Sequence, residues 1–328
     1  MVRPATAPHD SAATLGLDIG ATKLAAGVVG ADGTLRSFAR DSTPPGWRAA
    51  LRALIRLGRR ALTDAGIDAE ELDAVGIGCG GPLDTVTGVV DGPPNLPGWD
   101  AVPVVDLLRE AFEGCPTVLE NDANAAALAA YRWGPWADTP NLVYVTVSSG
   151  LGSGVIADGR LLRGASGNGG EIGHTPVDWQ GRRCGCGLRG CAEAYVSGNS
   201  IARRAREAVT GGTPSSLAQL KTITAVDVAA AVRAGDGLAT ELWAETTAIL
   251  GRVIGSVLNI FEPNVVILGG GVTDAGPMLL VPVRAAALQA ALPPARGAAE
   301  VVVSPHGRSV GVLGAAAAAA GLAVRVPA

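Results

Sequence analysis

The sequence predicts an α/β protein built from two related domains, and an internal repeat is the main observation behind this prediction. Residues 14–20 and 24–30 read as two strands joined by a tight turn, and an ADG turn follows them. Residues 141–162 repeat this scheme, and GVVGADGTLR aligns closely with GVIADGRLLR after one gap. One β-hairpin unit near the start of each half therefore predicts two similar domains. Two unrelated hairpins that share a common turn sequence remain the alternative.

Length and composition agree with this organisation. The chain has 328 residues, enough for two domains of ordinary size, and its 46 glycines suit an α/β protein rich in tight turns. The net charge of −4 argues against a nucleic-acid partner. The alanine-rich run from Leu313 to Val324 is too short and too weakly hydrophobic to span a membrane. Few cysteines, three of them in a metal-type cluster, indicate a cytoplasmic protein.

The remaining elements follow in chain order. Further strands are expected at residues 35–41, 73–79, 116–120, 264–270 and 300–305, with apolar helical stretches between them. A helix is expected to start near Asp122, and a final helix, Ser309 to Ala323, to cross back to the first domain. The predicted domains are a disordered tail (1–13) without a signal peptide, a small α/β domain (14–122 with helix 309–328) and a large α/β domain (123–308) with a loop at 174–191.

Three of the five cysteines stand together in HTPVDWQGRRCGCGLRGCAE, residues 174–193. Cys184 and Cys186 are too close for an easy disulfide, and Cys191 can pair with only one of them. With His174 they supply the four ligands of a tetrahedral Zn²⁺ site, which would be structural because no position is left for a reactive water. Free or redox-active thiols are the alternative. The fragment GCGLRG matches a dinucleotide fingerprint by accident, because no apolar strand leads into it.

Two turns of small residues suggest that the protein binds a nucleotide. DIGATK (18–23) offers main-chain amides, the Thr22 hydroxyl and the Lys23 cation beside Asp18, and SSGLGSG (148–154) offers Ser148, Ser149, Gly150 and Gly152. Turns without bulky side chains bring N–H groups close to phosphate oxygens, so two such turns could hold a polyphosphate between them. Neither of the two lysines stands in a Walker A context.

The strongest acid–base candidate lies in LENDANAAALAA, residues 119–130. Asp122 is placed where a buried strand becomes a helix N-terminus, and the plain alternative is that it only caps the helix. Other polar residues stand in glycine-rich surroundings and offer the acceptors and amides that bind a polyhydroxylated ligand. With Asp122 this set comprises Asp84, Asn95, Asn121, Glu171, His174 and Glu193.

From Leu15 onward the chain resembles the ROK sugar kinases, most closely their bacterial glucokinase branch. DIGATK and TVSSGLGSG look like the two phosphate motifs, ENDANAAALAA like the catalytic segment, and CGCGLRGCAEAYVSG like the zinc signature. The resemblance implies an actin-like (ribonuclease H-like) ATPase fold with two α/β domains around a cleft. It also implies an ATP site in the cleft and transfer of the γ-phosphoryl group to a sugar hydroxyl, first of all the 6-hydroxyl of glucose.

The resemblance assigns roles by motif position. Asp122 would be the general base, Asp18 would help to place Mg²⁺, and the zinc would be structural. Implied substrate contacts are Gly81, Asn95, Asn121, Asp122, Glu171, His174 and Glu193, with His174 also a zinc ligand. Implied nucleotide contacts are Asp18, Gly20, Thr22, Lys23, Ser149, Gly150 and Gly270. A homodimer is the implied assembly.

Two departures and several alternatives qualify this picture. Ser148-Ser149-Gly150 stands where the family usually has GTG, and Cys79 where it often has a small residue or proline. Other acceptors that fit the same motifs are N-acetylmannosamine, N-acetylglucosamine, fructose, allose and a cyclitol. Sugar-responsive repressors of the same family are a different class, but they carry an N-terminal helix-turn-helix domain, and Met1 to Ala13 is too short to form one. A non-catalytic sugar sensor is a further alternative, although it would not need to keep Asp122.

Overall fold

The computed structural model describes residues 13–320, which form two compact units. The first unit comprises residues 13–138, 163–168 and 309–320, and the second comprises residues 139–162 and 169–308. Of the predicted tail, only Ala13 is described, and it is the first residue of a strand. Among the described residues, no helix is both long and apolar enough to cross a membrane.

The first unit contains a five-stranded sheet in the order β3-β2-β1-β4-β7. Strand β2 is antiparallel to both of its neighbours, whereas β1, β4 and β7 are parallel. The strands are β1 (Ala13–Ile19), β2 (Lys23–Gly30), β3 (Ala39–Ser42), β4 (Ala74–Cys79) and β7 (Thr117–Asn121), and a separate pair is formed by β5 (Leu83–Asp84) and β6 (Val89–Val90). The strand expected at 35–41 is shorter than predicted and begins only at Ala39.

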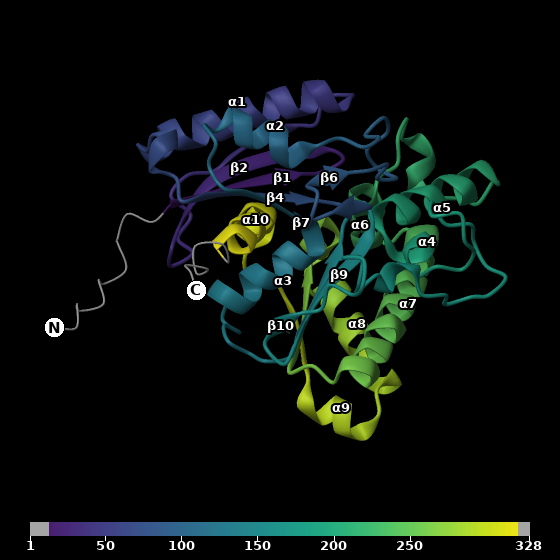
Figure 1. The fold of residues 1–328 in the computed structure, drawn as a ribbon. Coiled ribbons are helices and arrows are strands. Elements are labelled where there is room, and N and C mark those ends of the chain that lie inside the picture. The colour runs from purple at the N-terminus through teal and green to yellow at the C-terminus, as the bar shows by residue number, and fades with distance from the viewer. Residues whose placement is uncertain (1–12, 321–328) are drawn as a thin grey trace. The chain divides into compact units, whose positions relative to one another are not determined.

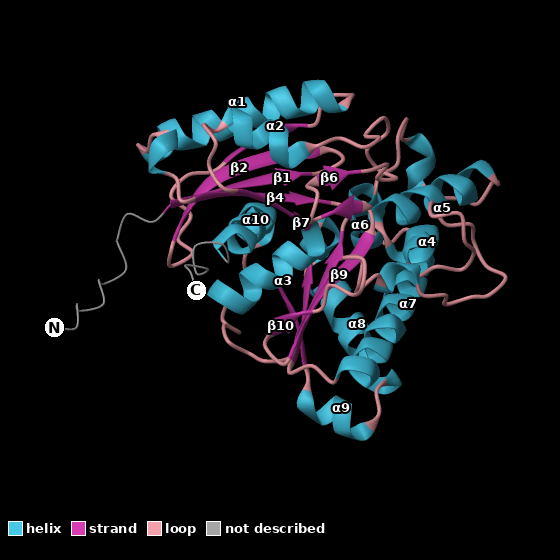
Figure 2. Ribbon diagram, in the orientation of Figure 1, coloured by secondary structure: helices cyan, strands magenta, loops and turns pink. Residues whose placement is uncertain are grey.

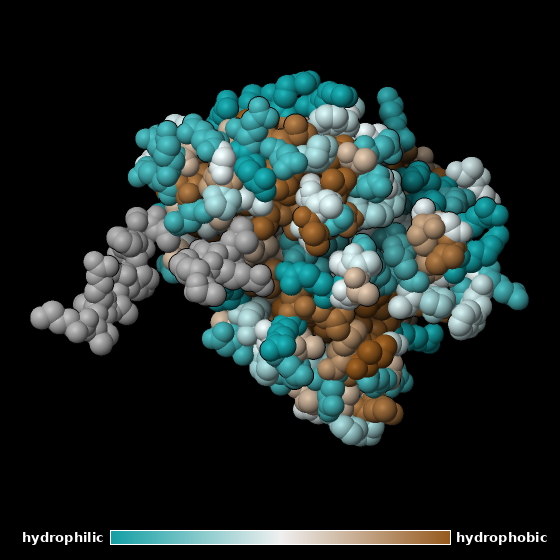
Figure 3. Space-filling view, viewed as in Figure 1, coloured by the Kyte–Doolittle hydropathy of each residue, from teal (hydrophilic) through white to brown (hydrophobic). Residues whose placement is uncertain are grey.

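Helices cover both faces of this sheet (Figure 1), namely α1 and α2 on one face and α3 and α10 on the other. Their bounds are α1 (Trp47–Ala65), α2 (Val104–Ala111), α3 (Asp122–Trp133) and α10 (Val310–Ala320). Because side chains alternate along a strand, Leu15, Leu17 and Ile19 enter the core under α1. The outer face of α1 is hydrophilic (Figure 3) and exposes Arg48, Arg52, Arg56, Arg59 and Arg60.

The alanine-rich helix α10 lies directly on the glycine positions of the sheet. A Cβ atom on Gly16 would lie 2.2 Å from the Val312 carbonyl oxygen, and one on Gly76 would lie 1.8 Å from the Ala315 oxygen. On its other side, a Cβ on Gly314 would lie 2.5 Å from the backbone of Ala125 in α3. Close packing of small residues therefore ties α10 and α3 to one sheet.

This packing also moves the domain boundary. The sequence-based boundary at residue 122 places α3 in the large domain, whereas the compact units place residues 123–138 in the first unit. The reason is the contact of α3 with α10, which a boundary drawn at a strand–helix junction does not foresee. The described part of the last helix begins at Val310, close to the expected start at Ser309.

The second unit repeats the topology of the first. Its sheet has the order β10-β9-β8-β11-β12, with β9 antiparallel to its neighbours and β8, β11 and β12 parallel. The strands are β8 (Leu142–Val147), β9 (Leu151–Ala157), β10 (Arg160–Leu161), β11 (Val265–Gly269) and β12 (Glu300–Val303). Both sheets share strand order and strand directions, so the predicted repeat of the hairpin unit is confirmed.

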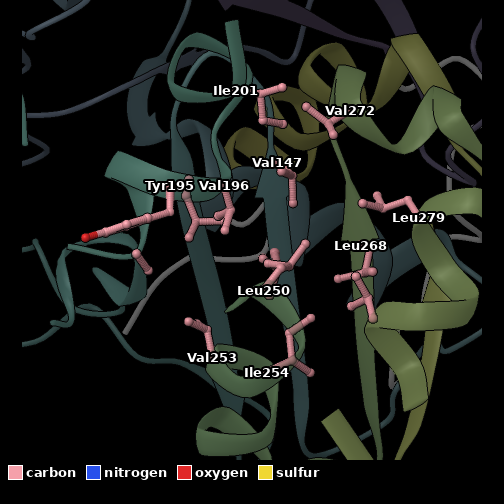
Figure 4. Close-up of a cluster of buried hydrophobic side chains, with 14 of the residues drawn as sticks. Val147, Tyr195, Val196, Ile201, Leu250, Val253, Ile254, Leu268, Val272 and Leu279 are labelled. Carbon is pink, nitrogen blue, oxygen red and sulfur yellow. The ribbon is translucent and has the colours of Figure 1, made fainter. Parts of the chain in front are cut away.

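Helices α7 and α8 pack side by side in the second unit (Figure 2). The helices are α4 (Glu193–Val196), α5 (Gly198–Thr210), α6 (Ala225–Arg233), α7 (Gly237–Phe261), α8 (Pro277–Ala290) and α9 (Pro293–Ala298). The short 3₁₀ helices of both units are η1 (Ala69–Glu71), which belongs to the first unit, and η2 (Ile172–His174), η3 (Ser216–Gln219), η4 (Gly271–Ala275) and η5 (Gly307–Ser309). One buried cluster joins residues of β8, β11, α4 and α7, among them Val147, Leu268, Val196 and Leu250 (Figure 4).

Candidate active site and metal cluster

The parallel strands of the first unit bring three candidate groups to one edge of the sheet. In the register of β1, β4 and β7, Ile19 pairs with Cys79 and Cys79 pairs with Asn121. Asp18 therefore lies near the carboxyl end of β1, and Asp122 directly follows β7. Ligands of open α/β sheets bind outside the carboxyl ends of the strands, so this edge is the candidate site of the unit.

Burial changes the acidity of all three groups at this edge. Burial raises the pKa of Asp122, although the Ala123 N–H partly opposes the shift by donating to its carboxylate at 2.8 Å. Burial, followed by the charge of Asp122, raises the pKa of Asp18 to about 7. The buried Cys79 thiol has its pKa raised by burial and then by the charges of Asp122 and Asp18. Two carboxylates thus share a poorly solvated place in which one charge disfavours the other.

The capping interpretation of Asp122 is wrong, because Asn121 caps the helix. The Asn121 Oδ1 accepts hydrogen bonds from the N–H groups of Ala123 at 2.9 Å and Asn124 at 3.2 Å, which are donors that an N-cap satisfies. Asp122 is instead the first residue of α3.

An ion pair between a buried carboxylate and a half-exposed arginine supports the junction of β7 and α3, and no local pattern in the chain predicts it. Glu120 is 3% exposed, and its Oε2 accepts from Arg163 Nη2 at 2.8 Å and Nε at 3.1 Å. Its Oε1 accepts from Asn124 Nδ2 and from the Asn121 N–H, both at 3.1 Å. Both oxygens of this carboxylate are thus engaged, and the backbone that presents Asp122 is held on both sides.

The predicted contacts in loops have different surroundings. A Cβ on Gly81 would lie 3.8 Å from Asn121 Nδ2 and 3.9 Å from Asn168 Oδ1, so these residues form one polar corner. Asn168 is not among the predicted contacts, although it lies in the polar, glycine-rich segment GNGGEIGH that also holds Glu171 and His174. Asn95 is exposed in the loop between β6 and α2.

Asp84 is a turn residue. Its Oδ1 accepts from the N–H groups of Val86 at 2.8 Å and Thr87 at 3.1 Å, and these backbone bonds, with the Thr87 side chain, lower the pKa of Asp84. Its expected place among the ligand-binding acceptors is therefore not supported, because its local bonds already explain its presence.

The first phosphate turn (Gly20–Lys23) is closed by the Gly20 N–H, which donates to the Lys23 carbonyl at 3.0 Å. Thr43, just beyond β3, supports it from outside. The Thr43 hydroxyl donates to the Gly20 carbonyl at 2.7 Å, and the Thr43 N–H donates to the Thr22 carbonyl at 3.1 Å. The side chains of Thr22 and Lys23 are exposed and are available to a ligand.

The second phosphate turn (Ser148–Gly150) joins β8 to β9. The Ser148 N–H donates to the Gly150 carbonyl at 2.9 Å and closes the turn. Gly270, which follows β11, has a φ of 87°, and a Cβ there would lie 2.5 Å from the Val147 carbonyl oxygen. Only glycine fits both this positive φ and this close approach to a carbonyl oxygen. Gly270 therefore lies against the residue that precedes the turn, in the same unit as the other predicted nucleotide residues Ser149 and Gly150.

The histidine and the three cysteines converge in the second unit as the spacing predicts. One ligand atom from each of His174, Cys184, Cys186 and Cys191 lies within 4.8 Å of the others. Cys184 Sγ is 3.7 Å from His174 Nδ1, and Cys186 Sγ is 3.7 Å from Cys191 Sγ. A tetrahedron with metal–sulfur bonds of about 2.3 Å separates its ligand atoms by about 3.8 Å, so the four donors have the spacing of a zinc site.

Two predicted sugar contacts adjoin this cluster. His174 Nε2, the ring nitrogen that does not face Cys184, lies 3.9 Å from Glu171 Oε2. Glu193, the first residue of α4, has its Oε1 3.8 Å from Cys184 Sγ, while its Oε2 accepts from the Leu151 N–H at 2.9 Å. His174 can therefore ligate a metal through one nitrogen and meet a ligand with the other.

Comparison with known proteins agrees with these motifs. The model of the ROK family matches residues 14–321. The chain belongs to the ROK family. A glucokinase of Thermotoga maritima is 35% identical over 307 residues, covering 92% of this chain and 95% of that protein. An N-acetylmannosamine kinase of Salmonella typhimurium is 36% identical over 268 residues, covering 79% and 83%.

A solved structure extends the likeness to three dimensions. A ROK family glucokinase of Streptomyces griseus, crystallised in complex with glucose and AMPPNP, is 32% identical and has a TM-score of 0.80. The match covers 94% of this chain and 99% of that chain. This ROK protein has the actin-like ATPase fold, as the duplicated sheets indicated.

Proposed function

We propose that this ROK protein is an ATP-dependent hexose kinase that transfers the γ-phosphoryl group to the 6-hydroxyl of glucose. The observation that carries the proposal is the Asp122 carboxylate, which follows β7, has a raised pKa, and is not needed as a helix cap. The Thermotoga relative is a glucokinase, and the Streptomyces structure holds glucose and AMPPNP. Both support glucose and ATP as the substrates.

Asp122 is the general base of this proposal. Phosphoryl transfer to an alcohol needs a carboxylate that accepts the hydroxyl proton while the oxygen attacks the γ-phosphorus in line. A raised pKa makes the ionised carboxylate a stronger base than an ordinary aspartate. The Asn121 cap and the Glu120–Arg163 ion pair hold the backbone on either side of Asp122, which keeps the carboxylate in one place.

The two phosphate turns bind the nucleotide through main-chain amides and the side chains of Thr22, Lys23 and Ser149. Magnesium would supply positive charge to the phosphate oxygens. We propose that Asp18 helps to position the magnesium ion. The pKa of Asp18 is raised to about 7, partly by the charge of Asp122, and a bound cation would offset the repulsion between these two carboxylates. Gly81, Asn95, Asn121, Glu171, His174 and Glu193 remain the proposed sugar contacts.

The cluster of His174 and the three cysteines holds a structural Zn²⁺ ion in this proposal. The donor set and the 3.7 Å separations support zinc, and four protein ligands leave no position for a reactive water. The ion would fix the loop that carries His174 and Glu193. A homodimer is also proposed from the family likeness, and light scattering during gel filtration tests it. A cytoplasmic location is proposed from the small number of cysteines and their clustering.

A phosphorylation assay with MgATP and a panel of sugars tests the function. We expect glucose to give the highest kcat/KM, with phosphate on the 6-hydroxyl identified by NMR. The Salmonella relative favours one second candidate, and a higher kcat/KM for N-acetylmannosamine than for glucose would replace glucose as the substrate. Fructose, allose, N-acetylglucosamine and a cyclitol complete the panel. Sugar binding without transfer to any acceptor would instead support a sugar-sensing regulator.

A further inference from the structure

The second phosphate turn is held in place by the same segment that carries the zinc ligands and the proposed sugar contacts. Ser148, the first residue of the turn, and Leu151, the residue that follows it, each contact that segment, which runs from Gly173 to Gly198 in the second unit. The Leu151 N–H donates to Glu193 Oε2 at 2.9 Å. The Gly198 N–H donates to the Ser148 carbonyl at 2.7 Å. Each end of the turn therefore has its own partner.

Steric contact adds to these hydrogen bonds. A Cβ on Gly173 would lie 2.0 Å from the Leu151 carbonyl oxygen, and one on Gly198 would lie 2.9 Å from the Ser148 oxygen. The turn and the segment also share one core, in which Val147 and Val196 belong to the same buried cluster (Figure 4). Close packing of this kind lets a shift on one side displace the other.

Glu193 contacts both the end of the second phosphate turn and the cluster of His174 and the three cysteines. It begins α4 two residues after Cys191, and its carboxylate has one oxygen on the phosphate turn and the other beside Cys184. A buried or half-buried N–H that loses a charged acceptor leaves an unpaired donor, which costs more than an ordinary hydrogen bond gains. Displacement of Glu193 therefore changes the phosphate turn directly.

We infer that Glu193 is a positioning residue for the nucleotide, in addition to its proposed contact with the sugar. Through the Leu151 N–H it keeps the second phosphate turn in the conformation that binds ATP. By linkage, a ligand that fixes Glu193 strengthens nucleotide binding, and the nucleotide strengthens sugar binding by the same factor. This inference rests on the proposed function for the identity of the ligands, whereas the contacts themselves do not depend on it.

The test is calorimetric titration of the zinc-loaded protein with AMPPNP and Mg²⁺ in the absence of sugar. Glu193→Ala should weaken nucleotide binding about tenfold, the low end for a hydrogen bond to a charged group. Glu193→Gln should stay within about twofold of wild type, because the amide oxygen can still accept from the Leu151 N–H. If Glu193 contacted only the sugar, the affinity for AMPPNP would be unchanged in both variants.

A second pair of variants leaves every proposed ligand-contacting side chain intact. Gly198→Ala places a methyl group against the Ser148 oxygen and should also weaken AMPPNP binding, with zinc content and sugar-free melting temperature near those of wild type. Gly237→Ala is the matched control, since Gly237 is likewise the first residue of its helix and a Cβ there meets nothing within 4 Å. It should bind AMPPNP as wild type does.

Two outcomes would overturn the inference. One is a Glu193→Ala protein that needs more sugar for half-saturation but binds AMPPNP normally without sugar, and the other is normal AMPPNP binding by Gly198→Ala. The proposed function fails on a different measurement. If wild type binds AMPPNP but phosphorylates no sugar in the panel, the kinase proposal is lost, while the comparison of nucleotide affinities still decides the role of Glu193.

Discussion

The two phosphate turns occupy corresponding places in the two sheets, yet different neighbours support them. In the first unit, Thr43, which follows β3, holds the turn through its hydroxyl and its N–H. In the second unit, Glu193 and Gly198 of the segment from Gly173 to Gly198 do so. The first turn is thus supported by the residue that follows a strand of its own sheet, whereas the second depends on a segment that also carries the proposed metal ligands. The two hairpins have the same strand arrangement, but different residues support their turns.

The chemistry at the strand ends differs as well. Asp18 lies one residue before Ile19, the last paired residue of β1, and Thr146 lies one residue before Val147, the last paired residue of β8. A carboxylate in the first unit therefore corresponds to a hydroxyl in the second. The repeated sheet supplies similar geometry in both units, and a few residues at its edge make the two units chemically different.

The largest effect should come from Asp122, the proposed general base. Asp122→Asn keeps the size of the side chain and leaves the Asn121 cap untouched, but the amide cannot accept the hydroxyl proton. We expect kcat to fall by at least about a hundredfold, the low end for general-base catalysis, with little change in glucose affinity or melting temperature. Steady-state kinetics at saturating glucose and ATP measure this.

Asp84→Asn is the matched control for this substitution. Its carboxylate is exposed and bonds only to the turn that follows it among the described residues, so kcat should remain near the wild-type value. A near-normal kcat for Asp122→Asn would refute the catalytic assignment and favour the sugar-sensing regulator.

Local pattern predicted the repeat, the metal cluster and the junction at Asp122. Each of these depends on residues that are near in sequence. Cys184, Cys186 and Cys191 stand close together, and alternation in 14–30 and 141–162 identifies the strands. The metal signal is strong because thiols clustered in a short loop with many glycines are typical of a metal site.

Pairing over long sequence distances was not predictable from the chain. Arg163 pairs with Glu120 across 43 positions, and Leu151 pairs with Glu193 across 42, and nothing local marks either partner. Asn121 shows a different difficulty. Asn and Asp both cap helices, so only the bonds of Asn121 to the N–H groups decide which of the adjacent residues is the cap.

The second prediction concerns the proposed zinc ion. If the two phosphate turns have different supports, this ion should stabilise the turn of the second unit and not that of the first. Purified protein should contain about one zinc per chain, and Cys184→Ser should lose it, because a neutral hydroxyl cannot replace a thiolate ligand. Since metal binding is coupled to folding, the melting temperature should fall by several degrees and the KM values of both glucose and ATP should rise. Metal analysis by mass spectrometry and calorimetry measure these effects.

Cys115→Ser provides the matched control. Cys115 is a buried cysteine of the first unit, and its Sγ lies 3.5 Å from the Leu72 carbonyl oxygen. Zinc content should stay at the wild-type level in this variant. A Cys184→Ser protein with no zinc, full activity and unchanged KM for ATP would show that the metal does not support the second turn.

The smallest effect should come from Thr43, the support of the first turn. Thr43→Val is nearly isosteric and removes only the hydroxyl that donates to the Gly20 carbonyl at 2.7 Å, while the Thr43 N–H can still donate to Thr22. Loss of one such bond costs about 1 kcal/mol, so the KM for ATP should rise about fivefold with the glucose KM unchanged.

Thr63→Val is the control, because its hydroxyl bonds only within α1 to the Arg59 carbonyl among the described residues. Initial rates over a matrix of ATP and glucose concentrations distinguish the outcomes. An equal rise in both KM values after Thr43→Val would mean that the first turn, like the second, is coupled to the sugar, and the contrast between the two supports would fail.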